Sequence, residues 1–130
     1  MIGTVKGDIH DIGKDIFEYM LEAYGFDVID LGVDVPSEIL VKNVEKHHPD
    51  IVALSGVLTS TVDEMKEVVN SLIEANFRDK VKIIIGANHL TKDTFRYIGA
   101  DSYATDASEG AKVCREWMKA GHGQGEEGNG

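Results

Sequence analysis

The sequence predicts an α/β fold in which helices cover both faces of a five-stranded parallel sheet. Three observations support this prediction. Short apolar runs alternate with longer amphipathic segments, glycines or prolines separate most of them, and 130 residues suit a single domain. Strands that alternate with helices build parallel sheets through right-handed crossovers. We therefore expect a ligand at the carboxyl edge of the strands.

Five short segments have the length and composition of strands. The runs that begin at Ile51 and Val81 are uninterrupted and apolar, as in parallel strands covered on both faces. A third segment, from Phe26, alternates apolar and polar residues. The predicted strands are 1–5, 26–31, 51–54, 81–85 and 101–103.

Between these strands, apolar residues recur at every third or fourth position, which is the spacing of one helix face. Gly25 is a natural C-cap, and Pro49 prevents the second helix from continuing. Capping boxes place helix starts at Thr61 and Asp106, each with a glutamate three residues later. The predicted helices are 12–24, 37–47, 61–73, 91–97 and 106–119. The whole pattern is that of a Rossmann-like, flavodoxin-like domain.

The chain divides into a folded domain, residues 1–119, and a tail, residues 120–130. The tail contains five glycines and almost no apolar side chains, so we expect it to be disordered. At the other end, the first strand has barely five residues before the loop that follows it. We therefore expect that Met1 opens a truncated piece of a longer protein.

Composition argues against several classes of function. A formal net charge of -10 disfavours binding to nucleic acid or to an anionic membrane, because both depend on clustered Lys and Arg. No apolar run approaches the roughly 20 residues of a membrane span, and none resembles a secretory leader. We expect a cytoplasmic protein with Cys114, the single cysteine, in its core.

The loop after the first strand carries the strongest chemical signal. It reads Gly-Asp-Ile-His-Asp-Ile-Gly, residues 7–13, and matches neither a P-loop nor a dinucleotide fingerprint in its glycine spacing. Asp8 and His10 are two residues apart, and a carboxylate that holds one histidine nitrogen leaves the other free to bind a metal. Two such residues without a third make a poor zinc site.

Two further loops at the same predicted edge carry polar residues. One holds Ser55, Thr59 and Thr61, and the other is Gly-Ala-Asn-His-Leu-Thr, residues 86–91. Taken alone, Ser55 could simply end a strand, and Thr59 could belong to a turn. Likewise, Asp106 could cap a helix without any ligand.

At these three loops the chain resembles the cobalamin-binding domains of methionine synthase, of the mutases and of corrinoid proteins in methyltransferase systems. The resemblance includes the Asp-x-His-x-x-Gly signature, which is Asp8, His10 and Gly13 here, and extends to about Lys119. It implies a cobalamin or related corrinoid whose nucleotide tail enters the protein. His10 then takes the lower axial position on cobalt, and Asp8 and Thr61 continue a proton relay.

The resemblance also implies a set of cofactor-binding residues. The family has a Gly-Gly pair where this chain has Gly86 and Ala87, and commonly a proline where it has His89, to which we assign no function. The implied cofactor-binding residues are Asp8, Ile9, His10, Asp11, Ile12, Gly13, Ser55, Val57, Leu58, Thr59, Gly86, Ala87, Tyr103, Ala104, Asp106 and Ala107.

Residues 55–65 resemble methionine synthase and the methyltransferase corrinoid proteins more than the mutases. The implied function is a methyl carrier whose cobalt takes a methyl group from one methyltransferase and presents it to a second. The second enzyme passes it to tetrahydrofolate or a thiol. The carrier is a subunit of an O-, N- or S-demethylase system, has no turnover alone and is served by a reductive activation protein.

Other interpretations predict different partners. A mutase domain would bind adenosylcobalamin, and a cobalamin-sensing regulator would need a DNA-binding segment. A phosphorylation receiver would need an aspartate and a lysine near the positions of Ser55 and Tyr103. The resembled corrinoid proteins carry an N-terminal helical cap domain, which we do not expect here, so the upper face of the corrin should be exposed. The residues do not identify the methyl donor.

Overall fold

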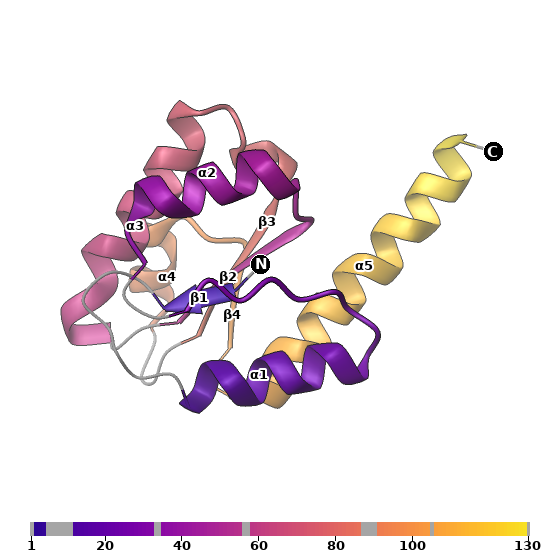
Figure 1. Cartoon of the computed structure of the whole chain (residues 1–130), viewed down its shortest axis with the longest axis horizontal. Helices are drawn as coiled ribbons and strands as arrows, with labels where there is room; N and C mark the ends of the chain where they lie inside the picture. Colours follow the sequence, from indigo (N-terminus) through magenta and orange to yellow (C-terminus); the bar gives the residue numbers. More distant parts are fainter. Residues whose placement is uncertain are drawn as a thin grey trace.

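The computed structural model describes residues 2–4, 12–32, 35–55, 58–86, 91–104 and 106–129, with side chains for 16–32, 35–55, 62–86, 91–104 and 106–119. Within these residues a parallel sheet lies between two groups of helices, as Figure 1 shows. The predicted α/β class, with a parallel sheet covered on both faces, is confirmed.

In the part of the chain that the structure describes, the sheet has four strands rather than the predicted five. They follow one another in the order β1 (Ile2–Thr4), β2 (Ile51–Ser55), β3 (Lys82–Gly86) and β4 (Ser102–Ala104), and every neighbouring pair is parallel. Each of these four strands lies where the sequence predicted one, within three residues at either end.

The prediction of a strand over residues 26–31 was wrong. Apart from an isolated bridge at Asp30, this segment is not part of a strand, although the alternation of its apolar side chains is real. Phe26 and Val28 pack against one apolar cluster of the core, whereas Leu31 packs against the other. The alternation therefore predicted correctly which side chains pack against the core. It does not suffice for a strand, which also needs backbone hydrogen bonds to a neighbouring strand.

Among the described residues, five α-helices cover the sheet. Helices α1 (Ile12–Ala23) and α5 (Ala107–Asn129) lie on one face, and α2 (Ser37–His47), α3 (Leu58–Glu74) and α4 (Lys92–Ile98) lie on the other (Figure 1). A short 3₁₀ helix, η1 (Arg78–Lys80), precedes β3. Because successive side chains of a strand point to opposite faces, the core forms two clusters.

The end of α1 and the start of α4 are fixed by local capping interactions. Gly25 follows α1 with a φ of +93°, and the Phe26 N–H donates to the Leu21 carbonyl, which is a Schellman ending. Thr91 caps α4 by accepting from the Thr94 N–H at 3.2 Å. The C-cap at Gly25 agrees with the sequence prediction, and α4 begins one residue after the predicted start at Thr91.

The capping box predicted at Thr61 was wrong, because α3 begins at Leu58 and Thr61 lies inside its first turns. Only two residues separate the end of β2 from the start of α3, so the helix begins three residues earlier than predicted. The predicted start at Asp106 is confirmed, since its carboxylate accepts from the Glu109 N–H at 2.8 Å.

Helix α5 continues to Asn129, beyond the predicted helix end near Lys119. Its last part contains glycines, each of which costs a helix about 1 kcal/mol relative to alanine. The disorder of residues 120–130 and the domain boundary at 119 stay predictions. Among the described residues, no helix is both long and apolar enough to span a membrane.

Cys114 lies in the core beside α1, as predicted, and its side chain is fully buried. Burial raises the pKa of its thiol from 9.0 to about 12, because the thiolate would lose its hydration. The thiol therefore stays neutral and acts as a small apolar group.

This buried thiol should make stability fall as the pH rises from about 9 towards 12. In that window the unfolded thiol loses its proton while the folded one keeps it, so the unfolded state binds fewer protons and is favoured. Urea unfolding between pH 8 and pH 10.5 should show a steeper decline for the native chain than for Cys114→Ala. The difference in slope should approach about 1.4 kcal/mol per pH unit. Parallel curves would contradict the burial of the thiol.

Candidate functional site

The carboxyl ends of the four strands are aligned in register. Thr4 pairs with Ser55, Ser55 with Gly86, and Gly86 with Ala104, so that one line of residues crosses the sheet at the end of each strand. The chain leaves the sheet along this line. Three of the predicted site residues, Ser55, Gly86 and Ala104, thus become neighbours although they are far apart in the sequence.

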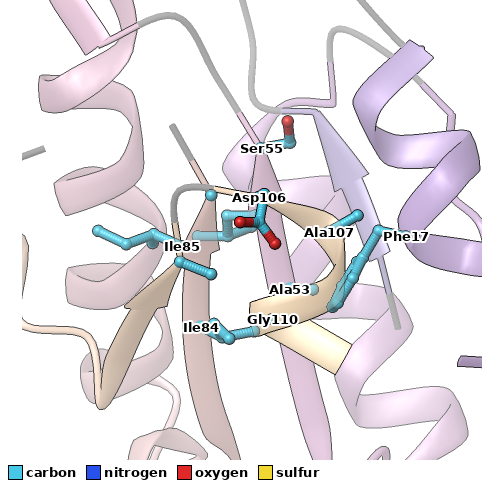
Figure 2. Close-up of a pocket in the computed structure, with 11 residues that line it drawn as sticks. Phe17, Ala53, Ser55, Ile84, Ile85, Asp106, Ala107 and Gly110 are labelled. Atoms are coloured by element: carbon cyan, nitrogen blue, oxygen red, sulfur yellow. The ribbon is translucent and has the colours of Figure 1, made fainter. Parts of the chain in front are cut away.

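A pocket opens at this edge, between the sheet and helices α1 and α5 (Figure 2). Its cavity volume is about 60 Å³, and the empty space within and around it, including open solvent at the mouth, is about 370 Å³. We call it the edge pocket. Its lining residues are Phe17, Ala53, Leu54, Ser55, Ile84, Ile85, Gly86, Ala104, Asp106, Ala107 and Gly110.

The edge pocket extends downward along the strands. Ser55 lies at one end of the group in Figure 2, and Ala53, Ile84 and Gly110 lie at the other. Ala53 pairs with Ile84 in the ladder, two residues below the pair of Ser55 and Gly86. Two residues of a parallel strand span roughly 6.6 Å, which is close to the length of a bicyclic aromatic ring system.

Of the described residues that line the pocket, two have polar side chains, Ser55 and Asp106. Ser55 ends β2 there, and Asp106 precedes α5, where its carboxylate accepts from the Glu109 N–H at 2.8 Å. Because this bond belongs to a helix cap, it holds the carboxylate in one place beside the mouth. The remaining side chains that line the pocket are aliphatic or aromatic, so the interior suits an apolar group with polar atoms at one end.

Gly110 explains how α5 comes so close to its neighbours. A Cβ at this position would lie 3.0 Å from Cε1 of Phe17 and 3.4 Å from Cβ of Ala104, and the first of these distances is shorter than a carbon–carbon contact. Neither Phe17 nor Gly110 was predicted as a site residue, and neither were Ala53 and Ile84. The available signal was a glycine inside an otherwise regular helix, which often marks close packing.

Tyr103 differs from the other residues of the predicted last loop. Its ring packs on Phe95, with ring centroids 5.1 Å apart, in the cluster on the α2–α4 face of the sheet. Its side chain therefore does not line the edge pocket, whereas Ala104, Asp106 and Ala107 do. A contact between Tyr103 and a ligand stays a prediction.

The remaining predicted residues cannot be placed by their side chains. Asp8, Ile9, His10, Asp11, Val57 and Ala87 lie outside the described residues, as does His89. Ile12 and Gly13 begin α1, and Leu58, Thr59 and Thr61 begin α3, where only the backbone is described. Among the residues that the structure does describe, no group of three or more His, Cys, Asp or Glu is arranged to hold a metal ion.

The family model described as the B12 binding domain matches residues 1–112, and the chain belongs to this family. It is 41% identical over 116 residues to dimethylamine corrinoid protein 3 of Methanosarcina mazei, covering 89% of this chain and 70% of that protein. The cofactor of this domain is thus a corrinoid of the cobalamin type. The domain is of the kind found in the corrinoid proteins of methyltransferase systems.

Solved structures agree with this family. A cobalamin-binding protein from Desulfitobacterium hafniense DCB-2 is 46% identical, with a TM-score of 0.86 over 89% of this chain and 57% of that one. The methanol:cobalamin methyltransferase complex of Methanosarcina barkeri is 30% identical, with a TM-score of 0.83 over 91% of this chain and 45% of that one. The chain thus spans only about half of these longer proteins.

Response-regulator receiver domains share the fold alone. One from Mycobacterium tuberculosis has a TM-score of 0.65 but is only 15% identical, over 91% of this chain and 95% of that one. The receiver alternative, which the absence of an aspartate at Ser55 already disfavoured, thus has no support beyond the architecture.

The described residues fit a corrinoid with a nucleotide tail. The edge pocket offers an apolar interior, polar groups at the mouth, and a helix glycine that keeps α5 free of a Cβ beside the floor. It also lies at the carboxyl edge of the sheet, where β1 ends at Thr4.

Asp106 should contribute to stability through its cap. Asp106→Ala removes the acceptor for the Glu109 N–H and should lower the free energy of unfolding by about 1 kcal/mol. Asp106→Asn, which retains a capping oxygen, should lose much less. Chemical denaturation of both variants beside the native chain measures this difference. An equal loss in the two variants would show that the negative charge, rather than the cap, matters.

Proposed function

We propose that this chain carries a methyl group on the cobalt of a bound corrinoid, and that it passes the methyl group between two methyltransferases. The observation that carries this proposal is the edge pocket, an apolar slot at the carboxyl edge of the sheet. In the sequence, the Asp-x-His-x-x-Gly motif follows the first strand. Membership of the B12-binding family and likeness to methylamine corrinoid proteins support it.

The edge pocket would hold the nucleotide tail of the corrinoid. Its apolar walls from the sheet and from α1 suit the flat base, which loses unfavourable contact with water when it is buried. Ser55 and Asp106 lie where the more polar sugar and phosphate end of the tail would leave the protein. The backbone of Gly86 leaves space beside it, because the nearest atom to a Cβ there would be the Ala104 carbonyl oxygen at 4.0 Å.

His10 is proposed as the lower axial ligand of the cobalt. When bound, the corrinoid supplies a cobalt centre that accepts and releases a methyl group, and the protein tunes it through this ligand. A histidine binds metal through a neutral nitrogen, so its second nitrogen must keep a proton. Asp8 is the acceptor that would hold that proton, and Thr61 would continue the relay towards solvent.

The chain is proposed to be a carrier subunit with no turnover alone. The methylamine and methanol systems among its relatives differ in methyl donor, yet their corrinoid domains resemble this chain throughout. The donor is therefore selected by the partner methyltransferase. A second methyltransferase would pass the methyl group to tetrahydrofolate or a thiol, a reductive activation protein would rescue oxidised cobalt, and all would act in the cytoplasm.

Visible absorption spectra test the cofactor and the role of His10 together. The purified chain is incubated with hydroxo- and methylcobalamin, beside His10→Ala and the control His47→Ala. His47 is a matched control because it is exposed in the last turn of α2. We expect saturable binding by the native chain and by the control, with spectra that indicate a displaced nucleotide base and imidazole ligation.

In His10→Ala, the imidazole-ligated spectrum should be lost or replaced by a water-ligated one, with affinity reduced at least tenfold. Failure of the well-folded native chain to bind either cobalamin would reject the proposal. Spectra of His10→Ala that match the native chain would assign the axial ligand elsewhere. Strong selectivity for adenosylcobalamin over methylcobalamin would favour a mutase domain instead.

A further inference from the structure

The floor of the edge pocket is formed where α5 packs against α1 and the sheet. At that point Gly110 faces the edge of the Phe17 ring, and its missing Cβ would lie 3.0 Å from Cε1 and 3.5 Å from Cδ1 of that ring. Figure 2 shows Phe17 beside Ala107 and Gly110, on the side of the pocket opposite Ile85. The ring and the glycine are thus complementary in shape, and both line the pocket.

Among the described residues, no polar side chain lines this floor. Ala53 and Ile84 form its sheet side, and both are buried in the cluster that also includes Ala104. The backbone groups of β2 and β3 are engaged in the parallel ladder between them. A polar atom that reached this depth would find few partners, and an unpaired polar atom in an apolar site lowers affinity.

We propose that Phe17 and Gly110 determine which corrinoid this chain accepts, by admitting a flat, mainly apolar lower base of the benzimidazole type and disfavouring a purine base. The inference rests on the proposed binding of the nucleotide tail in the edge pocket. It adds the class of base that the pocket takes and the two residues that set the class.

The space at the floor of the edge pocket limits the size of the base that can reach it. An alanine at position 110 would place a methyl group against the Phe17 ring, and the ring is the more movable partner because the other close neighbour, Cβ of Ala104, belongs to a strand. The added methyl group, the displaced ring, or both would then occupy space at the floor. A base that reaches the floor would lose room, whereas a corrinoid without a base would not.

The two classes of lower base also differ in polarity. A dimethylbenzimidazole ring carries methyl groups on the edge that points away from its sugar. Adenine carries ring nitrogens and an amino group that bind water when exposed. Against Phe17, Ala53 and Ile84 these polar atoms would be buried with no partner among the described side chains of the floor. The pocket should therefore prefer the benzimidazole.

The experiment measures dissociation constants from visible absorption titrations of three corrinoids. These are hydroxocobalamin, the corresponding corrinoid with adenine as its lower base, and cobinamide, which lacks the nucleotide. The proteins are the native chain, Gly110→Ala, and Gly110→Ala combined with Phe17→Leu. Gly121→Ala, in the same helix but outside the lining residues, controls for the change in helix propensity. Circular dichroism and thermal unfolding confirm that each variant folds.

We expect the native chain to bind hydroxocobalamin at least tenfold more tightly than the adenine corrinoid. Gly110→Ala should weaken hydroxocobalamin binding at least tenfold while its affinity for cobinamide stays within twofold. The added Phe17→Leu should restore most of the loss, because leucine leaves space for the new methyl group. Gly121→Ala should behave as the native chain.

Three outcomes would overturn the inference. They are unchanged hydroxocobalamin binding in a folded Gly110→Ala variant, an equal loss for hydroxocobalamin and cobinamide, and equal native affinity for the two lower bases. An equal loss would show that Gly110 serves packing alone. These results differ from a failure of the proposed function, in which the native chain would bind none of the three corrinoids.

Discussion

The alignment of the strand ends is the constraint on which the rest of the site depends. Thr4, Ser55, Gly86 and Ala104 occupy one line across the sheet, because each parallel ladder keeps its neighbour in register. The segments that leave the sheet after β1, β2, β3 and β4 all begin along that line. A slip of one residue in any ladder would turn a pocket side chain to the opposite face of the sheet.

The two faces of the sheet differ in how densely they are packed. On the α2–α4 face, side chains such as Met65, Leu72 and Ile83 are fully buried and fill the space between sheet and helices. On the α1 and α5 face, small residues such as Ala53 and Gly110 leave the edge pocket open. Empty space in a core removes van der Waals contacts and so lowers stability. Dense packing on the α2–α4 face offsets this loss on the α1 and α5 face.

The same domain occurs in relatives whose names refer to different methyl compounds. The chain matches dimethylamine corrinoid protein 3 of Methanosarcina mazei and the methanol:cobalamin methyltransferase complex of Methanosarcina barkeri, and it spans only about half of the longer solved chains. The B12-binding domain is therefore common to these proteins, whereas the rest of each relative's length lies outside it.

The sequence by itself determined the features that depend on neighbouring residues. The bounds of α2, the cap at Asp106 and the burial of Cys114 follow from local patterns, and the loop motif indicated the cofactor family. Tertiary structure alone decided that residues 26–31 form no strand and that Phe17 meets Gly110 below the mouth of a pocket. Both depend on which distant segment lies alongside, and periodicity within a segment carries no information about that partner.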